Sequence, residues 1–415
     1  MASYAIPLSG LQAESSLLNV ISNNLANLNT DGYKNQTLNF GDVFAAAQGA
    51  SGNGDPIQVG SGVQVVGTTS NFSNGNIAST GVDSNMAIQG NGMFVVKNAS
   101  GQTSYTRDGD FTVNSSGQLV TPSGELVMGY PATNGVVSTT GALGPITVNS
   151  TGTVPGAATS SFQMTTNLDS AAATGTTFST PITVYDSLGT AQTMNVEFTN
   201  TGTGAWSYNI SLPATATGGT GTTPTTVASG TMTFDSSGNL LTPAGGSVTG
   251  ITISGLADGA APMKLTWNLD SSSGGSTITQ LDSASATSAT SQNGYGVGTL
   301  TGFNVGPDGT IEGTFSNLQT QALGQVAIAS FGNVQGLTQG NNGDYQATTS
   351  SGAAVIGRAN AGGNGVIEGS SVEESNVDLS AEFSNMIVAQ QGYEANAKAL
   401  TTFDQIAQAT IQLVS

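Results

Sequence analysis

Residues 379–414 read LSAEFSNMIVAQQGYEANAKALTTFDQIAQATIQLV, and this stretch decides the fold. From 377 to 415 the sequence contains no proline and only one glycine, Gly392, so a helix can run through it without a break. A helix of about 38 residues is roughly 57 Å long. Its apolar residues recur at alternating steps of three and four, as in a heptad seam. The seam and its flank include Leu379, Phe383, Met386, Tyr393, Leu400, Phe403, Ile406, Ile411 and Val414.

Four polar residues mark the start and the interior of this helix. Asn376 or Asp378 can cap its first turn, and the charge of Asp378 suits the helix dipole. Gln390 and Asp404 occupy positions within the seam. Single polar residues at such positions can fix the register of paired helices, or they can face a channel, and both interpretations stay open.

A second helix is expected at the other end of the chain, from about 4 to 28. Its apolar residues follow the same heptad pattern, and Gly32 can end it in the left-handed conformation. The seam comprises Leu11, Leu18, Ile21, Leu25 and Leu28. Paired with the longer helix, it would cover about two-thirds of that helix. The apolar surface left over requires burial against other subunits, at roughly 1.5–3 kcal/mol per buried Leu, Ile or Phe.

The middle of the chain is rich in Gly, Ser and Thr, and its patterns predict β-structure. One motif recurs at 111–119, 232–240 and 303–311: alternating apolar residues, a turn with glycine at a constant offset, then another apolar residue. That offset suits a type I turn followed by a left-handed residue, so three antiparallel hairpins are predicted. A further hairpin is expected at Gly90-Asn-Gly92.

The expected fold class is therefore mainly β with helical termini. The helices pair as a coiled-coil-like core domain, and one of two antiparallel β-domains, a sandwich or barrel, is inserted in the other. Low-complexity segments at 150–161 and 283–291 bracket the insert. The predicted parts are a helical core at 1–32 and 372–415, a connector at 33–73 and 359–371, a first β-domain at 74–149 and 288–358, and the insert at 150–287.

Composition excludes several classes of function. Charged residues make up 7% of the chain, and only six Lys and Arg stand against 25 Asp and Glu, for a net charge of −19. Nucleic acids and anionic membranes both require clustered cations, which this sequence lacks. Cysteine and histidine are absent, which removes disulfides, thiol chemistry and the commonest general base. The first residues do not resemble a cleavable secretory signal.

The acidic residues offer little chemistry, so no catalytic, cofactor-binding or metal-binding residue is expected. Residues 108–114 place carboxylates two apart, but they lack the sixth-position glycine and closing glutamate of a calcium loop, so a turn is the better interpretation. Glu373-Glu374 is interpreted as a solvated lead-in to the last helix. A carbohydrate-active enzyme would need paired carboxylates near aromatic residues, and only Asp270 near Trp267 offers this.

Two terminal stretches carry a family resemblance. Residues 22–34, SNNLANLNTDGYK, and residues 375–398, SNVDLSAEFSNMIVAQQGYEANAK, resemble the signatures of bacterial flagellar rod and hook proteins. Segments 86–96, 105–111 and 185–192 are similar to parts of hook subunits. The signature residues are Ser22, Asn23, Asn24, Leu25, Ala26, Asn27, Asn29, Thr30, Gly32, Tyr33, Lys34, Ser375, Asn376, Val377 and Asp378. Chain length and the β-insert favour the hook subunit over the distal rod and other axial proteins of this family.

The resemblance implies a structural role. Hook subunits stack into a curved hollow tube outside the cell, which acts as a universal joint between rod and filament. The implied partners are further copies of the chain, the distal rod protein, the hook–filament junction proteins, the hook cap and the flagellar type III export apparatus. Export would proceed without signal cleavage. The alternative from another class is a secreted β-rich adhesin or surface-layer protein, which leaves both terminal signatures unexplained.

Overall fold

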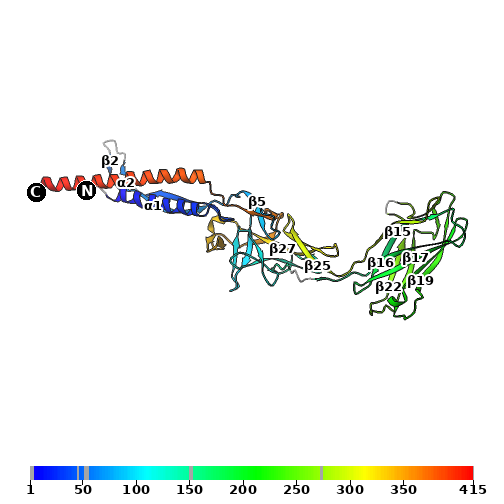
Figure 1. Cartoon of the computed structure of the whole chain (residues 1–415). Coiled ribbons are helices and arrows are strands. Elements are labelled where there is room, and N and C mark those ends of the chain that lie inside the picture. Colours follow the sequence, from blue (N-terminus) through cyan, green and yellow to red (C-terminus); the bar gives the residue numbers. More distant parts are fainter. Residues whose placement is uncertain (1–3, 44–45, 51–55, 149–152, 272–273, 415) are drawn as a thin grey trace. The chain divides into compact units, whose positions relative to one another are not determined.

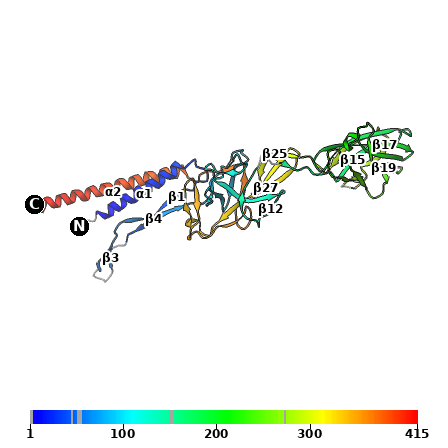
Figure 2. The same cartoon turned by 90° about the horizontal axis from the view of Figure 1, so that it is seen from below.

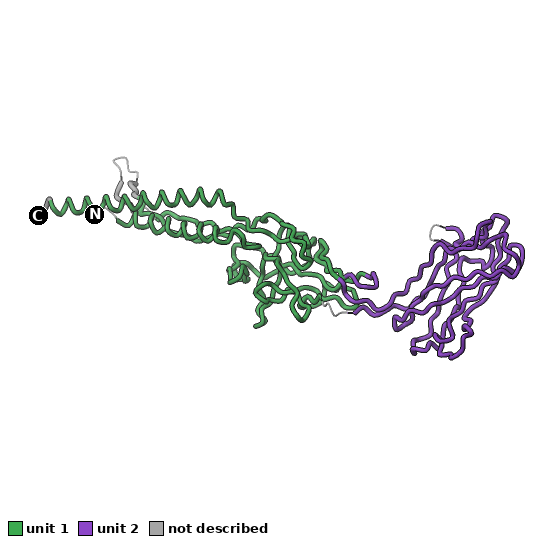
Figure 3. Tube along the Cα trace, viewed as in Figure 1, with its two compact units in different colours: residues 1–149, 302–313, 320–415 green, residues 150–301, 314–319 purple. Residues whose placement is uncertain are grey.

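The computed structural model describes residues 4–43, 46–50, 56–148, 153–271 and 274–414. The chain forms two compact units, shown in green and purple in Figure 3. Unit 1 contains Met1–Asn149, Gly302–Gly313 and Thr320–Ser415, and unit 2 contains Ser150–Thr301 and Thr314–Gln319. Unit 2 is thus inserted in unit 1. Its second border lies beyond the predicted 287 because strand β24 (Ala286–Gln292), expected as a flexible bracket, pairs with β15 (Ser161–Asp169).

The terminal helices lie side by side in unit 1, as Figures 1 and 2 both show. Helix α1 spans Ala5–Ala26 and α2 spans Leu379–Val414, which confirms the predicted helical ends. They run antiparallel, because residues later in α1 contact residues earlier in α2. Tyr4 meets Phe403, Gly10 meets Asn396 and Asn24 meets Glu382. The helix pairing is therefore confirmed.

Two antiparallel strand pairs follow α1 in the sequence and extend alongside the helical layer, as Figure 2 shows. Strand β1 (Gln36–Asp42) pairs with β4 (Val63–Ser70), and β2 (Ala46–Ala50) pairs with β3 (Pro56–Val59). Residues 51–55, part of a predicted loop, lie outside the described residues. The β1–β4 pair packs against α1, so the predicted connector is a hairpin that extends the helical layer.

The β-body of unit 1 is built on one large sheet, ordered β25-β26-β27-β11-β7-β8-β29-β28. Its core contains Met93, Val95, Tyr105, Met128 and Tyr130 among other residues. The strands of this path are β25 (Gly298–Val305), β26 (Thr310–Phe315), β27 (Thr320–Ser330), β11 (Leu126–Thr133), β7 (Met93–Lys97), β8 (Thr103–Thr106), β29 (Asp344–Gln346) and β28 (Thr338–Gln339). Shorter strands on the sheet are β9 (Thr112–Val113), β10 (Leu119–Val120), β12 (Val136–Val137), β13 (Gly144–Pro145) and β30 (Val355–Arg358), and a 3-10 turn η2 covers Val334–Gly336.

Two small strand pairs connect the body to the last helix. Strand β5 (Ile77–Ser79) pairs with β32 (Ser371–Glu373), and β6 (Met86–Gln89) pairs with β31 (Val366–Gly369). The hairpin predicted at Gly90-Asn-Gly92 is wrong. Strand β6 pairs with β31 and β7 with β8, β11 and β27, so this segment is a crossing between sheets. Gly90 and Gly92 instead adopt positive φ values of 112° and 120°, which glycine accepts readily.

Unit 2 consists of two sheets around one core. The first sheet contains β21 (Ser247–Ile253), β22 (Met263–Asn268), β15, β23 (Ile278–Leu281) and β24. The second contains β16 (Thr177–Tyr185), β17 (Ala191–Gly202), β18 (Ala205–Leu212), β19 (Thr225–Phe234) and β20 (Leu240–Thr242), and η1 covers Ala214–Thr217. Strand β14 (Thr153–Val154) pairs with the start of β25. The insert was expected to be antiparallel, but β15 pairs in parallel with both β22 and β23.

The core of unit 2 follows from alternation along its strands. Every second residue of β15 from Phe162 to Leu168 is buried, as expected for a sheet with one packed face. Trp267 sits at the centre: it stacks on Phe162 with centroids 5.7 Å apart and meets Tyr208 edge-on at 5.5 Å. Trp206 is also fully buried, so both tryptophans of the chain lie in unit 2.

The three recurrent hairpins are confirmed. Strands β9 and β10, β19 and β20, and β25 and β26 are each neighbours in a sheet. The turn glycines Gly117, Gly238 and Gly309 have φ values of 75°, 82° and 83°. Each donates its N–H to the carbonyl three residues earlier, at 2.9, 3.0 and 2.9 Å. A left-handed glycine after a tight turn is what the sequence pattern required.

Candidate assembly site

The helix pair is held by contacts between small and polar residues. The Tyr4 hydroxyl donates to the Phe403 carbonyl at 3.3 Å, and their rings meet edge-on at 6.3 Å. A Cβ on Gly10 would lie 2.7 Å from the Asn396 side chain, and one on Gly392 would lie 2.6 Å from Glu14 Oε1. Glycines at these two points therefore allow the backbones to approach closely.

The predicted seam of α1 lies partly inside this pair. Ile21 is buried, whereas the other α1 seam residues are half-buried: Leu11, Leu18, Leu25 and Leu28. In α2, Met386, Leu400 and Phe403 are half-buried. The exposed predicted residues of α2 are Leu379, Phe383, Tyr393, Ile406 and Ile411. The side chain of Val414 lies outside the described residues. Gln390 and Asp404 are both exposed, and Gln408 donates to the Asp404 carboxylate at 3.1 Å.

The exposed residues form an apolar stripe on α2, defined here as Leu379, Phe383, Ile387 and Tyr393. Their side chains are 42%, 49%, 54% and 42% exposed. At 100° per residue, the stripe is centred roughly 120° around α2 from the face that meets α1. The reason is steric: α1 packs on the small residues Ala389 and Gly392, which leaves the bulky residues outside the pair. Sequence periodicity alone had placed both functions on one seam.

Two cavities lie beside the pair. One of about 400 Å³ is lined by Ile6, Ala13, Phe40, Val63 and their neighbours, so it is bounded by α1, α2 and the β1–β4 hairpin. Another of about 210 Å³ is lined by residues of α1, β1 and α2, including Leu17 and Val388. Val388 is 66% exposed and Phe40 is 43% exposed. The helical layer thus combines protruding apolar side chains with apolar recesses.

A buried charge cluster joins the helices to the β-body. The Lys34 ammonium donates to Glu373 Oε1 at 2.6 Å, and Arg107 Nη1 donates to Glu373 Oε2 at 3.1 Å. Lys34, Arg107 and Glu373 are 1%, 3% and 0% exposed. Burial lowers the pKa values of Lys34 and Arg107, and the Glu373 carboxylate opposes both shifts. Two cations therefore share one carboxylate away from water.

Backbone groups complete this cluster. Lys34 also donates to the Ser73 carbonyl at 2.9 Å, and Arg107 donates to the carbonyls of Ile88 and Gly90 at 3.1 and 2.6 Å. Glu373 Oε1 accepts from the Gly75 N–H at 2.8 Å. A buried carboxylate with two cations and an N–H donor has its charge well compensated.

A second network ties α1 to β1 and α2. The buried Asn24 donates to Glu382 Oε1 at 3.1 Å and to the Gln36 carbonyl at 2.8 Å. Its side-chain oxygen accepts from the Tyr33 hydroxyl and from the Gln36 N–H at 3.1 and 3.0 Å. Asn23 donates to the Tyr33 hydroxyl at 3.1 Å. Burial raises the pKa of Glu382, while the hydrogen bond from Asn24 opposes that shift.

The segment before α2 is fixed by its own polar residues. Asn376 accepts from the Asn35 N–H at 2.7 Å and donates to the Asn71 carbonyl at 2.8 Å. Asp378 caps α2 by accepting from the N–H groups of Ser380 and Ala381 at 2.8 and 3.1 Å, so of the two proposed caps it is the one used. Gly32 has φ 68°, and a Cβ there would clash with the Asp108 backbone nitrogen.

The structure sorts the signature residues into three groups. Asn24, Gly32, Tyr33, Lys34, Asn376 and Val377 belong to the junction or are buried beside it. The exposed signature residues are Ser22, Asn23, Ala26, Asn29, Thr30 and Asp378. Leu25, Asn27 and Ser375 are half-buried.

The interpretation of Glu373-Glu374 as a solvated lead-in is wrong for Glu373, which is fully buried, and right for the exposed Glu374. Arg107 was missed because its role depends on a partner 266 residues away. The only available signal in the sequence was the scarcity of cations. With so few Lys and Arg residues, each one is a candidate for a specific ion pair.

No cluster of three or more His, Cys, Asp or Glu side chains in the described residues is placed to hold a metal ion. The turn predicted at 108–114 is confirmed at its start, where Asp108 Oδ1 accepts from the Asp110 N–H at 2.9 Å. No helix within the described ranges is sufficiently long and apolar to cross a membrane.

Comparison with known proteins covers both ends and both β-units. Four family models match: the flagella basal body rod protein at 7–34, the flagellar hook protein FlgE/F/G D1 domain at 87–156, the flagellar basal body protein FlaE D2 domain at 147–295, and the flagellar basal body rod FlgEFG protein C-terminal at 368–413. The flagellar hook protein FlgE of Salmonella typhimurium is 34% identical over 99% of this chain and 100% of its own length. The FlgE proteins of Escherichia coli and Treponema pallidum are 33% and 30% identical, over 99% and 100% of this chain and 99% of each relative.

Proposed function

Because the chain belongs to the flagellar hook protein FlgE family and is a structural subunit of the bacterial flagellar hook, we propose that its helix pair is the element through which it polymerises. The observation that carries this proposal is the apolar stripe of α2. Four large apolar side chains lie at helical spacing on one face, each more than two-fifths exposed. Isolated soluble chains avoid such continuous apolar surface, and a neighbouring subunit would bury it.

The contact is between different surfaces of adjacent copies. The stripe of one subunit enters the recesses beside the helix pair of the next, where Phe40 and Val388 offer apolar walls. Such a heterologous contact leaves one unpaired surface at each end of the stack, so it extends into an open helical assembly when its rotation does not close a ring. Because each stripe residue is already about half buried in the monomer, its further burial contributes roughly half of the 1.5–3 kcal/mol that a full burial gives.

The β-units supply the compliance of a universal joint. Charged residues are 7% of the chain, so contacts between β-units of neighbouring copies rest mainly on small polar groups. Such contacts are individually weak and exchange readily with water. A cohesive helical core with exchangeable outer contacts lets a curved hollow tube rotate while it transmits torque from rod to filament.

The same role sets the surroundings of the protein. We place it outside the cell, in the flagellar hook, after export by the flagellar type III apparatus without signal cleavage. Its partners are copies of itself along the tube, the distal rod protein at one end, and the hook–filament junction proteins and the hook cap at the other. A structural role in the universal joint requires no catalytic group or cofactor.

The test is polymerisation of purified full-length variants, followed by sedimentation and electron microscopy. Phe383→Ser and Ile387→Ser remove exposed apolar side chains, so each monomer should keep its fold and lose at least tenfold in the rate of tube growth. The matched control is Gln391→Ser, an exposed α2 residue roughly 100° from the stripe centre. Tubes that grow normally from both stripe variants would contradict the proposal. Removal of 379–415 should abolish tubes altogether.

A further inference from the structure

The turn between β26 and β27 holds an exposed leucine in a strained backbone conformation. Leu318 has φ 62° and is 87% exposed, the highest exposure of any large apolar residue in the described ranges. The left-handed region is unfavourable for any residue with a Cβ, and a bulky side chain there is an outlier. Because the side chain of Leu318 contacts little of its own chain, packing within the subunit does not offset this strain.

The chain builds the same kind of turn three times with glycine at this position. Gly117, Gly238 and Gly309 have φ values of 75°, 82° and 83°, and each donates its N–H to the carbonyl three residues earlier. Leu318 has the same geometry, because its N–H donates to the Phe315 carbonyl at 2.9 Å. Glycine would therefore fit position 318 without strain, and the leucine points to a role outside the isolated subunit.

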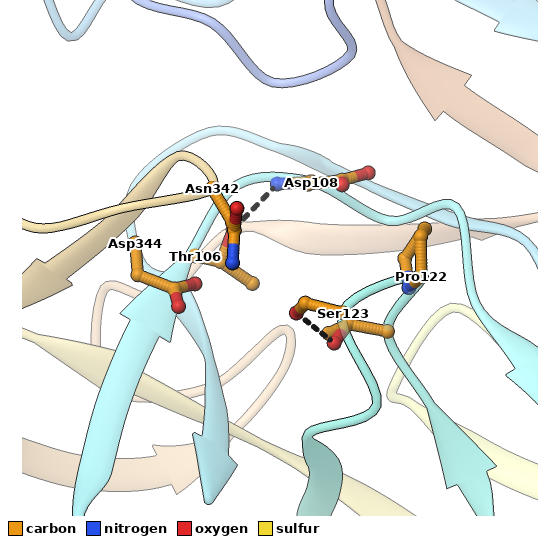
Figure 4. Close-up of a pocket in the computed structure, with 7 residues that line it drawn as sticks. Thr106, Asp108, Pro122, Ser123, Asn342 and Asp344 are labelled. Carbon is orange, nitrogen blue, oxygen red and sulfur yellow. Dashed lines mark hydrogen bonds between the residues drawn. The ribbon is translucent and has the colours of Figure 1, made fainter. Parts of the chain in front are cut away.

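Leu318 also differs from the other residues that share its backbone conformation. Among the described residues, the other non-glycine residues with positive φ are Asn134, Asn342, Asn360 and Ser370. Figure 4 shows one of them, Asn342, at the wall of a polar cavity of about 260 Å³. A short polar side chain can form local hydrogen bonds that make this conformation acceptable. Leucine has no such compensation.

Hydrogen bonds hold the turn in one conformation. The Ser316 N–H donates to the Thr299 carbonyl at 2.8 Å, and the Thr299 N–H donates to the Ser316 hydroxyl at 3.0 Å. The Asn317 side-chain amide donates to the Gly296 carbonyl at 2.9 Å. Leu318 therefore protrudes from a preorganised support, which lowers the entropy lost when it makes a contact.

Two further exposed apolar residues lie beside this turn. Val297, which is 52% exposed, follows the Gly296 carbonyl that Asn317 binds. Leu188 is 56% exposed, and a Cβ on its neighbour Gly189 would lie 3.2 Å from Val297 Cγ2. All three belong to unit 2. The apolar patch of unit 2 is defined as Leu188, Val297 and Leu318.

This patch is uncharged in a strongly acidic protein. The three segments that carry it contain no charged residue: 187–190, 295–299 and 315–320. Asp186 beside it is fully buried, and the exposed Asp258 accepts from Gln192 at 3.4 Å at its margin. Copies with a net charge of −19 repel each other, so an uncharged apolar area is where two of them can meet. A basic partner would favour the acidic surface instead.

We propose that the apolar patch of unit 2 docks on a second copy of this chain, with Leu318 as its central residue. The chain is a structural subunit of the hook, so copies of itself are its neighbours along the tube. Burial of the leucine in the tube offsets the backbone strain that the free subunit carries. The inference rests on the role as a hook subunit, but not on the stripe of α2, which lies in unit 1. It adds one apolar anchor to outer contacts that are mainly polar.

The first test is assembly of full-length variants, measured by sedimentation over a series of protein concentrations. Leu318→Asn relieves strain, so its monomer should be at least as stable as the parent, yet the concentration needed for tubes should rise about tenfold or more. Leu318→Met keeps the apolar bulk and should assemble as the parent does. The matched control is Leu241→Asn, which replaces an exposed leucine of unit 2 outside the patch. A weakened assembly with a stabilised monomer cannot be explained by misfolding.

The second test uses the absence of cysteine from the chain. Leu318→Cys, labelled with the polarity-sensitive fluorophore bimane and mixed in trace amounts with the parent, should shift its emission to the blue as tubes form. The same label on Leu241→Cys should keep its emission. A label at 318 that stays exposed to water in tubes of the pure protein would overturn the proposal, as would assembly of Leu318→Asn at the parent's concentration.

The two assembly proposals fail separately. If Leu318→Asn assembles poorly while Phe383→Ser and Ile387→Ser form tubes normally, the patch is supported and the stripe of α2 is refuted. The opposite pattern refutes the patch alone.

Discussion

Replacement of Glu373 by glutamine tests the buried charge cluster at the junction. Glutamine keeps the size of the side chain and one acceptor oxygen but removes the only anion between Lys34 and Arg107. Both cations are at least 97% buried, so neither can regain water without opening the junction. Removal of one partner from a buried ion pair typically costs about 3–5 kcal/mol.

Lys34→Met is the informative comparison. It leaves Arg107 and Glu373 as a neutral pair and removes the hydrogen bond to the Ser73 carbonyl. Its cost should be about 1–2 kcal/mol, which is the cost of an unsatisfied polar group. We expect the parent to be more stable than Lys34→Met, and Lys34→Met to be more stable than Glu373→Gln. This order follows from the buried charge that each variant leaves without a counter-ion.

The protein provides its own internal reference for the assay. Both tryptophans lie in unit 2, whereas the α-helices of the described chain lie in unit 1. In a denaturant titration, the helical far-ultraviolet signal should shift in Glu373→Gln while the tryptophan transition stays in place. The loss of stability in Glu373→Gln should become smaller as pH rises toward the ordinary lysine pKa of about 10.4, because the Lys34 that this variant leaves unpaired then loses its proton. Equal costs for the two variants, or a moved tryptophan transition, would refute this reasoning.

Three further predictions concern other parts of the chain. Gly10→Val should separate the helix pair and lower helical content, since its Cβ would approach the Asn396 side chain to 2.7 Å; circular dichroism measures this, and an unchanged spectrum would contradict the close approach. Leu318→Asn should stabilise the protein by about 0.5–1 kcal/mol, because Leu318 has φ 62° and is 87% exposed, so strain is relieved and no packing is lost; loss of stability would show a hidden contact. Burial raises the pKa of Asp186, but hydrogen bonds from Gln192, Thr190 and Leu188 outweigh it and hold the pKa below its usual value. The contribution of the Asp186 carboxylate to stability is therefore present above the unfolded-state pKa of about 3.9 and is lost as pH falls further. Asp186→Asn should thus flatten the acid limb of the tryptophan-detected curve of stability against pH. An unaltered acid limb would argue against this contribution.

Local chemistry made part of the fold predictable. The helices were predicted because a long heptad seam without proline has few other solutions, and α2 begins at the residue after its aspartate cap. The three hairpins were predicted because each turn needs a left-handed glycine at a fixed offset. These features depend on neighbours within about ten residues.

Features set by distant partners were not predictable in this way. Parallel pairing of β15 with β22 and β23 joins strands about 100 residues apart, and nothing in their alternation distinguishes parallel from antiparallel neighbours. The burial of Glu373 depends on Lys34 and Arg107, so its local sequence, a pair of glutamates before a helix, was misleading. The division of α2 into a pairing face and an exposed stripe depends on where α1 approaches most closely.

The Lys34–Glu373 contact limits when the fold can be completed during synthesis of the chain. It closes a loop of 339 residues, among the longest that a chain of 415 residues can make. Because a ribosome makes Lys34 early and Glu373 late, nascent or prematurely terminated chains cannot close this loop. The junction can therefore close only after Glu373 has been made. A chain that stops before this residue lacks the rigid support from which α2 presents its stripe.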